Sequence, residues 1–227
     1  MYKTCNLQYK VDYMAENLHE YRKSYEKGAL TKDLVDANPL QQFRHWFYEV
    51  EEQEGSGEVN AMTLTTIGLD GFPRGRVVLL KKYDEKGFYF YTNYESSKGK
   101  AIENNNRVSL SFFWPVMERQ VIIKGIAERT SLEDSTNYFH SRPKGSQLGA
   151  VVSDQSSVID SREELETRLK ALEKEYENKE VPKPSTWGGY LVRPSEFEFW
   201  QGRPNRLHDR IQYRLEGLDW NIERLSP

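Results

Sequence analysis

Residues 61–93 read AMTLTTIGLDGFPRGRVVLLKKYDEKGFYFYTN, and the fold class depends on the pattern in this stretch. Three runs rich in β-branched and aromatic residues, 61–69, 74–83 and 88–93, are separated by the turn-forming sequences Asp70-Gly71 and Asp84-Glu-Lys-Gly87. Short runs of this kind between tight turns are typical of antiparallel strands. The stretch therefore predicts a meander of three strands.

The rest of the chain adds more strands and a few helices. Strand-like runs occur at 108–114, 120–129, 190–193, 196–200, 210–213 and 220–224. Helices are expected at 39–50, from Ser96 or Ser97 to about 104, from Ser131 towards Pro143, and at 162–177, where Leu165, Leu169, Leu172 and Tyr176 form one apolar stripe. Five or more closely connected strands indicate a barrel. The predicted class is mainly β with flanking helices (α+β).

Two regions are expected along the 227 residues. Residues 1–35 are polar and charged, with tyrosines at helical spacing, and predict an N-terminal helical arm or lid. Residues 36–227 predict a single domain, because all-β barrels of this length are commonly one unit. The 14 Tyr, 10 Phe and 5 Trp supply much of the area available for burial.

Bulk properties exclude several classes of protein. A net charge of -3 without a concentrated basic stripe argues against nucleic acid or anionic lipid as a partner. No apolar run approaches the ~20 residues that span a bilayer, and the chain start lacks a signal core, so we expect a cytoplasmic protein. The single Cys5 fits a surface or packing thiol. Four His and one Cys offer no zinc-like spacing, so no metal site is expected.

Two cationic runs are candidate anion sites. Arg74-Gly-Arg-Val-Val-Leu-Leu-Lys-Lys82 places cations at both ends of an apolar strand. These cations could bind phosphate, although a core strand with solvated ends has the same pattern. Tyr91-Thr-Asn93 precedes Ser96-Ser-Lys98 at a helix start, where backbone N–H groups and a lysine could bind an anion. Ordinary helix capping explains these serines equally well.

Two later runs carry further candidates. Tyr138-Phe-His-Ser-Arg-Pro-Lys-Gly-Ser146 brings hydroxyls and a guanidinium near a helix end and could hold a second phosphate; the alternative is a helix ended by proline. Glu198-Phe-Trp-Gln-Gly-Arg-Pro-Asn-Arg-Leu-His-Asp-Arg210 is the densest cluster of ionisable groups. In an extended segment, Arg206, His208 and Arg210 would share one side. A lone histidine is nevertheless more often structural.

At these residues the sequence resembles the pyridoxamine 5′-phosphate oxidase family, from about residue 21 to the end. Nine blocks occur in the family's order: Arg-Val-Val-Leu-Leu-Lys, Phe-Tyr-Thr-Asn, Glu-Arg-Gln-Val, Tyr-Phe-His-Ser-Arg-Pro, Ser-Gln-Leu-Gly-Ala, Gln-Ser-Ser, Pro-Ser-Thr-Trp-Gly-Gly, Phe-Trp-Gln-Gly and Arg-Leu-His-Asp-Arg. The resemblance implies an FMN-binding split β-barrel that works as a homodimer, with two active sites at the subunit interface.

The resemblance also implies site residues. FMN would be held by Arg76, Val77, Val78, Leu79, Leu80, Lys81, Tyr91, Thr92, Ser97, Lys98, Gln120, Gln155, Ser156, Trp187 and Arg210. The substrate would contact Arg22, Lys23, Ser24, Tyr25, Lys81, Tyr138, Arg142, Ser146, Arg206, Leu207 and His208. Arg206 and His208 would be the catalytic pair beside C4′. Family members usually have Arg where this chain has Ser97, so we expect weaker retention of FMN than in those relatives.

The implied reaction converts pyridoxamine or pyridoxine 5′-phosphate to pyridoxal 5′-phosphate. Hydride would pass from C4′ to FMN, and O2 would reoxidise the flavin and form H2O2. Two alternatives remain open at this point: a related split-barrel flavin oxidoreductase acting on another substrate, and a non-catalytic carrier of flavin or pyridoxal phosphate.

Overall fold

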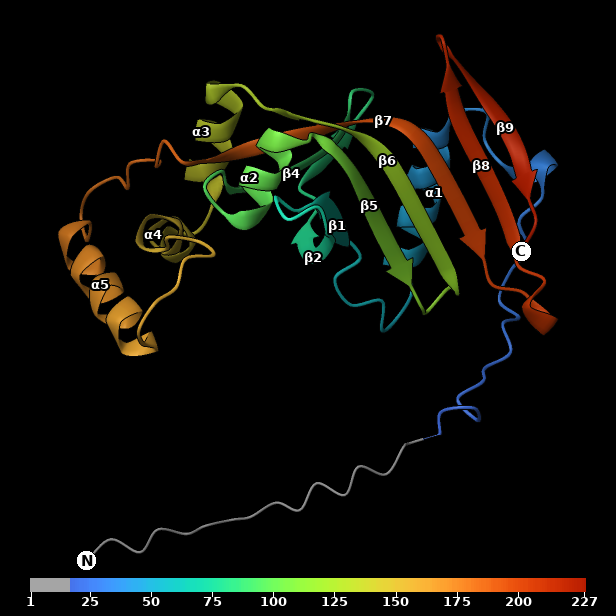
Figure 1. Ribbon diagram of the computed structural model, residues 1–227, viewed down its shortest axis with the longest axis horizontal. Coiled ribbons are helices and arrows are strands. Elements are labelled where there is room, and N and C mark those ends of the chain that lie inside the picture. The colour runs from blue at the N-terminus through green and yellow to red at the C-terminus, as the bar shows by residue number, and fades with distance from the viewer. Residues whose placement is uncertain (1–16) are drawn as a thin grey trace, which may run out of the picture.

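A single antiparallel sheet dominates the protein, for which a computed structural model describes residues 17–227 (Figure 1). Over these residues the sheet has nine strands: β1 (Ala61–Ile67), β2 (Pro73–Leu79), β3 (Lys82–Asp84), β4 (Gly87–Asn93), β5 (Arg107–Trp114), β6 (Arg119–Arg129), β7 (Trp187–Gln201), β8 (Asp209–Glu216) and β9 (Asp219–Leu225). The same residues form five α-helices: α1 (Pro39–Glu51), α2 (Ser97–Asn104), α3 (Leu132–Ser141), α4 (Lys144–Val152) and α5 (Arg162–Glu175). Short 3-10 helices are η1 (Lys32–Leu34) and η2 (Pro204–Arg206).

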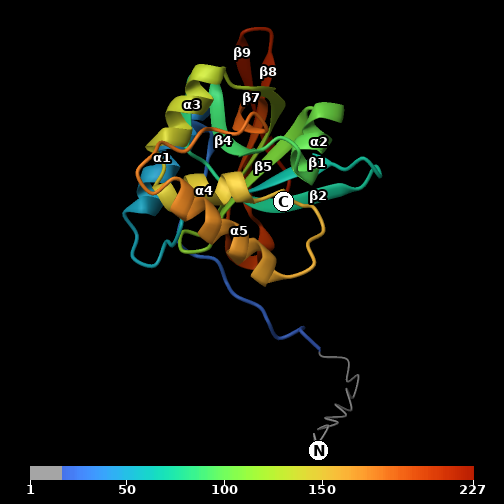
Figure 2. The same cartoon turned by 90° about the vertical axis from the view of Figure 1, so that its left-hand side faces the viewer.

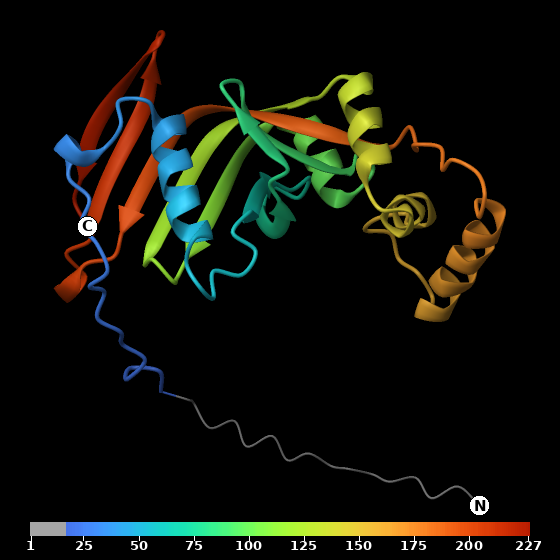
Figure 3. The same cartoon turned by 180° about the vertical axis from the view of Figure 1, so that it is seen from behind.

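Strand β7 organises the sheet. The strand order is β2-β1-β5-β6-β7-β4-β3, and β8 with β9 extends the sheet from β7. β6 pairs with β7 along most of its length, whereas β4 pairs with the first part of β7 and β8 with the last part. The sheet divides and curls into a half-barrel (Figures 1 and 3). The predicted fold class, a split barrel with flanking helices, is confirmed.

The main core lies between α1 and the curled sheet (Figure 3). Asn38 caps α1 by accepting a hydrogen bond from the Leu40 N–H, and Pro39 is the first helical residue, so the predicted helix starts as expected. Phe43 is fully buried, and its ring meets the edges of Phe88 and Phe112 at centroid distances of 5.0 Å. Aromatic packing thus fixes α1 on the sheet.

A smaller core lies beside the start of β7 and joins α3, α4 and α5 to the sheet (Figure 2). Ser131 caps α3 by accepting from the Asp134 N–H, as the sequence predicted. Phe139, Leu148 and Trp187 are buried there, and Leu169, Leu172 and Tyr176 pack against them. The apolar stripe predicted for 162–177 is therefore only partly covered, since α5 has no fully buried residue.

Two predictions of local structure are wrong, and one helix was not predicted. The meander ends after β2: the Leu80 N–H donates to Asn60 O and the Lys81 N–H to Tyr89 O, so the chain changes neighbours there and β4 joins β7. The runs 190–193 and 196–200 form one strand, because a bulge opposite Lys124 and Gly125 accommodates Pro194. The separate helix α4 was not expected, since Gly145 and Gly149 weaken its helical pattern.

The predicted helical arm is also wrong over residues 17–31, which are extended or in turns. The backbone N–H groups of Glu26, Lys27 and Leu30 donate to the side chains of Glu118 and Asp209 instead of forming a helical ladder. Only η1, within 1–35, is helical among the described residues, and the predictions for 1–16, including Cys5, lie outside them. No helix in 17–227 is long and apolar enough to cross a membrane.

Candidate functional site

A cleft of about 620 Å³ lies where α3 and α4 meet the ends of β2, β4 and β7. We call it the phosphate cleft. Its lining includes twelve of the residues predicted for the site: Val77, Val78, Leu79, Lys81, Tyr91, Thr92, Lys98, Tyr138, Arg142, Ser146, Gln155 and Trp187. Asn93, Pro143, Gly149, Ala150 and Ser153 complete the lining. Segments far apart in the sequence are therefore brought to one cavity.

Lys98 forms the polar centre of one end of this cleft. Its Nζ donates to Thr92 Oγ1 at 3.1 Å, Ser96 Oγ at 3.2 Å and Gln155 Oε1 at 2.8 Å. Burial, with the charges of Arg76 and Arg74, lowers the pKa of Lys98 to about 8. A lysine whose pKa is lowered by burial and by neighbouring cations is typical of an anion-binding site.

Arg142 provides the charge at the other end. Its Nη2 donates to Ser146 O at 2.7 Å, and its guanidinium carbon lies 4.7 Å from the centroid of the Trp187 ring. Its Nη1 is buried and has no hydrogen-bond partner among the described residues. Burial lowers the pKa of Arg142. A buried donor without an acceptor is costly unless a ligand accepts from it.

Aromatic rings form the wall between these cations. Tyr91 stacks on Tyr138 with a centroid distance of 3.8 Å, and the Tyr91 ring lies nearly parallel to that of Trp187 at 5.7 Å. Among residues 17–227, no Asp or Glu side chain lines the phosphate cleft, whereas Lys81, Lys98 and Arg142 do. The cleft can therefore accept an aromatic ligand that carries negative charge.

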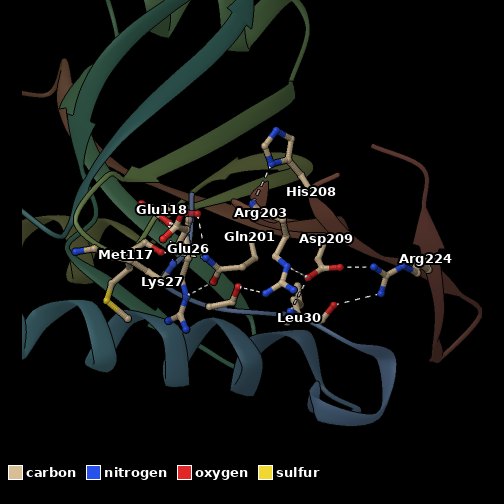
Figure 4. A network of polar contacts seen from close by, with 12 residues as sticks. Glu26, Lys27, Leu30, Met117, Glu118, Gln201, Arg203, His208, Asp209 and Arg224 are labelled. Atoms are coloured by element: carbon tan, nitrogen blue, oxygen red, sulfur yellow. Dashed lines mark hydrogen bonds and ion pairs between the residues drawn. The ribbon is translucent and has the colours of Figure 1, made fainter. Parts of the chain in front are cut away.

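The predicted catalytic pair lies elsewhere in the chain, between β7 and β8. The His208 ring packs on Trp200 at a centroid distance of 4.7 Å and on Tyr25 at 5.8 Å. We call Tyr25, Trp200, Arg206 and His208 the His208 corner. Figure 4 shows the polar contacts around it. The structure places Arg22, Lys23 and Ser24 just before Tyr25, and Leu207 is exposed between the two catalytic candidates.

A hydrogen bond from the backbone determines the tautomer of the neutral His208 ring. Its Nδ1 lies 3.1 Å from the backbone nitrogen of Arg203, which can only donate (Figure 4). The neutral ring therefore carries its proton on Nε2. Burial and the charge of Arg206 lower the pKa of His208, while Asp209 opposes that shift. Arg206 has a φ of 61°, a conformation that costs about 1–3 kcal/mol for a residue other than glycine.

Two predicted cofactor ligands, Gln120 and Arg210, lie next to Trp200 of the His208 corner and do not line the cleft. Gln120 lies opposite Trp200 on β6, and Arg210 lies opposite Trp200 on β8. Directly opposed residues project from the same face, so the three side chains form one row across the sheet. Arg210 pairs with Glu198 at 2.8 Å, and Gln120 donates to Ser111 at 3.4 Å.

The remaining predicted cofactor ligands, Arg76, Leu80, Ser97 and Ser156, do not line the cleft. Arg76 donates to Leu64 O and Thr66 Oγ1, and burial lowers its pKa. Leu80 is buried in the core and does not line the cleft. Ser97 is exposed at the start of α2, and Ser156 follows Gln155 with a φ of 75°.

The phosphate cleft and the His208 corner lie at opposite ends of β7. Trp187 lines the cleft and Trp200 packs on His208, and thirteen residues at ~3.3 Å each extend roughly 40 Å along the strand. One small substrate cannot reach both within one chain. The prediction that Arg206 and His208 face the same substrate as Arg142 therefore requires a second copy of the chain.

Sequence reasoning missed several residues of the corner. Trp200 packs on His208, and the backbone N–H of Arg203 donates to the His208 ring. Glu118 and Asp209 bind the backbone next to Tyr25, and Figure 4 shows both of them with Arg203. Trp200 and Glu118 stand in blocks that carry the family resemblance, but no role was assigned to them. Among residues 17–227, no three or more His, Cys, Asp and Glu side chains are grouped so that they could hold a metal ion.

The fold and this split arrangement define a class, the split-barrel proteins related to pyridoxamine 5′-phosphate oxidase. The chain resembles the crystal structure of PhzG from Burkholderia lata 383 in complex with tetrahydrophenazine-1-carboxylic acid, with a TM-score of 0.83 and 26% identity, over 90% of this chain and 100% of that one. It shares its fold, at a TM-score of 0.66 and 14% identity, with an FMN-binding protein from Nostoc punctiforme, over 85% of this chain and 100% of that one.

The family follows from two further comparisons. Residues 50–175 match the family model described as pyridoxamine 5′-phosphate oxidase, and 187–227 match the C-terminal dimerisation region of pyridoxine 5′-phosphate oxidase. The chain belongs to the pyridoxamine 5′-phosphate oxidase family. A pyridoxine/pyridoxamine 5′-phosphate oxidase of Flavobacterium johnsoniae is 63% identical over 92% of this chain and 99% of that protein. One of Flavobacterium psychrophilum is 56% identical over 93% and 100%.

Proposed function

We propose that the chain oxidises pyridoxamine 5′-phosphate and pyridoxine 5′-phosphate to pyridoxal 5′-phosphate, with FMN as its cofactor, O2 as the final acceptor and H2O2 as the second product. The relatives of 63% and 56% identity, matched over nearly their whole length, support this activity. The observation that carries the proposal is the phosphate cleft, which gathers cations and aromatic rings without a carboxylate. Two phosphorylated aromatic molecules fit such a lining.

The residues present fit FMN and the substrate phosphate. Lys98, Thr92 and Gln155, with Arg76 beside them, would hold the FMN phosphate, since Lys98 is buried among cations. Arg142, Tyr138, Ser146 and Lys81 would hold the substrate phosphate, which would supply the acceptor missing from Arg142 Nη1. Bound FMN would supply the two-electron acceptor that amino-acid side chains lack.

The His208 corner would act on the pyridine ring and C4′. His208 presents a neutral ring with its proton on Nε2, so it can donate a hydrogen bond without adding charge. Arg206 supplies a fixed positive charge that stabilises negative charge developing on the substrate or cofactor. Tyr25 closes one side of the corner, and with Trp200 it would limit the access of water to the reacting carbon.

A homodimer would unite the two halves. The match of 187–227 to a dimerisation region supports this assembly, because these residues include β7, β8 and three members of the His208 corner: Trp200, Arg206 and His208. In the dimer, the phosphate cleft of one protomer would face the His208 corner of its partner. Each dimer would then have two equivalent sites, as the closed symmetry of homodimers requires.

The test begins with the purified protein and its colour. We expect a yellow protein whose flavin is released as FMN on denaturation and which, in air, converts pyridoxamine 5′-phosphate to pyridoxal 5′-phosphate with one H2O2 per turnover. Pyridoxamine without its phosphate serves as the matched control substrate and should react far more slowly. Bound flavin without turnover would support the carrier, and equal turnover of the unphosphorylated amine would support an oxidoreductase for another substrate.

A further inference from the structure

Glu118 is a buried carboxylate that the proposed chemistry does not use. It ends the turn between β5 and β6, is 2% exposed, and has a φ of 55°. Its Oε2 accepts hydrogen bonds from the backbone N–H groups of Glu26 at 2.7 Å and Lys27 at 3.0 Å (Figure 4). Burying a carboxylate and holding a residue other than glycine at a positive φ both cost free energy. The hydrogen bonds from Glu26 and Lys27 offset part of this cost, so Glu118 binds the N-terminal segment 22–30 specifically.

Asp209 fastens the same segment a few residues later. It is 6% exposed, and its Oδ2 accepts from the Leu30 N–H at 3.0 Å. Arg224 pairs with its other oxygen, and Arg203 lies between Asp209, at 3.4 Å, and Gly28 O, at 2.6 Å (Figure 4). Charge-assisted bonds to backbone groups are stronger than neutral ones. The segment is therefore held at two points, on either side of Gly28.

At Gly28, between these points, and at Tyr25, just before them, the segment lies in direct contact with the end of β7 and the glycine that follows it. A Cβ at Gly202 would come within 2.7 Å of Tyr25 Cγ, and a Cβ at Gly28 within 2.9 Å of Gln201 Oε1. This close approach places the Tyr25 ring 5.7 Å from that of Trp200 and 5.8 Å from that of His208, each edge to face. The position of Tyr25 thus depends on residues 26–30 being bound.

We propose that Glu118 and Asp209 are positioning residues that bind the backbone of residues 26–30 and thereby hold Tyr25 against the catalytic His208. The inference rests on the proposed function, in which the His208 corner meets the substrate. An anchored segment is already ordered before substrate arrives, so its ordering does not reduce the apparent affinity. Loss of an anchor therefore weakens substrate binding more than it slows the chemical step.

Glu118 offers the cleaner test, because Asp209 adjoins His208. We expect Glu118→Ala to raise the KM for pyridoxamine 5′-phosphate about tenfold and to change kcat less than twofold, with Glu118→Gln in between because it keeps one acceptor oxygen. Glu128→Gln, which removes a surface carboxylate paired with Arg193, is the matched control and should leave both constants unchanged. In a Tyr25→Ala background, Glu118→Ala should add little to KM, whereas a general loss of stability would add its effect in both backgrounds.

Limited trypsin cleavage after Lys27 measures the anchoring without turnover. In the purified protein, Glu118→Ala and Glu118→Gln should speed cleavage at least fivefold, while Glu128→Gln should not. Wild-type KM and cleavage rates in both Glu118 variants would overturn the positioning role alone, as would full additivity with Tyr25→Ala. A wild-type chain that binds FMN and does not oxidise the substrate would overturn the proposed function and, with it, the role in positioning.

Discussion

Nζ of Lys98 lies 2.8 Å from Oε1 of Gln155, a residue that follows it by 57 positions. The contact joins the start of α2 to the loop after α4. Burial and the charges of Arg76 and Arg74 lower the pKa of Lys98 to about 8. The binding of an anion by Lys98 is therefore sensitive to pH in a range where most lysines remain charged.

FMN affinity should fall as the pH rises through 8. A lysine with a lowered pKa is protonated below that pKa and neutral above it, so its attraction for a phosphate dianion is present at pH 7 and is lost towards pH 9. The phosphate itself stays doubly charged over this range. We expect the Kd for FMN to rise about tenfold between pH 7 and 9. Titration by flavin fluorescence measures it, and Lys98→Arg, which stays charged, should remove most of the dependence.

Ser97→Arg should strengthen FMN binding. Ser97 is exposed at the first turn of α2, next to Lys98. An added guanidinium would provide one more charged donor in a partly solvated position, worth about 1 kcal/mol or roughly a fivefold lower Kd. Ser97→Ala is the control and should leave the Kd unchanged. Equal or weaker binding by Ser97→Arg would contradict the prediction.

Arg142→Gln should impair the use of phosphorylated substrate. The variant loses the buried donor Nη1 that the substrate phosphate is proposed to meet. A charge-assisted hydrogen bond of about 1.5–3 kcal/mol corresponds to a roughly 10- to 150-fold loss of kcat/KM for pyridoxamine 5′-phosphate. The exposed Arg162→Gln is the matched control. A similar loss in both variants, or in neither, would argue against a phosphate site at Arg142.

Phe43→Ala should destabilise the fold. The Phe43 side chain is fully buried between α1 and the sheet, and removing it leaves a cavity among Phe88, Phe112 and Tyr83. Such a change costs about 3–5 kcal/mol in the free energy of unfolding. Phe72→Ala, at a side chain that is 72% exposed, should cost far less. Urea unfolding of both variants at one protein concentration gives the comparison, because dimerisation adds to stability.

Local patterns predicted local structure well. The spacing of Phe43, Trp46 and Val50, with Asn38 as cap, was sufficient for α1, because the apolar spacing and the cap involve only residues within a few turns of one another. The pairing of β4 with β7 was not predictable in this way, since Tyr91 and Gly189 are neighbours across the sheet but almost a hundred residues apart. Pairing of distant strands depends on the whole fold, whereas the meander prediction used only adjacent runs.

The residues of the candidate site were also predictable only in part. The family resemblance supplied Lys98, Arg142 and the other residues that the structure gathers in the phosphate cleft. It gave no role to Glu118, whose partners are backbone N–H groups about ninety residues earlier. Every residue except proline has such a group, so the sequence does not indicate which ones Glu118 binds. The separation of Arg206 from Arg142 was equally invisible in sequence, because it depends on the length and direction of β7.

Mixing two impaired variants should restore activity if each site spans two chains. Arg142→Gln damages the phosphate cleft and His208→Gln damages the corner at the far end of β7. In a heterodimer of the two, one site would carry both changes and the other neither. Statistical reassortment makes half of the dimers mixed, each with one of two sites intact, so co-refolded protein should recover about 25% of wild-type activity. Each variant refolded alone is the control, and it should show no gain over its own low residual activity. A mixture no more active than its components would place the whole site within one chain, which the extent of β7 between Trp187 and Trp200 argues against.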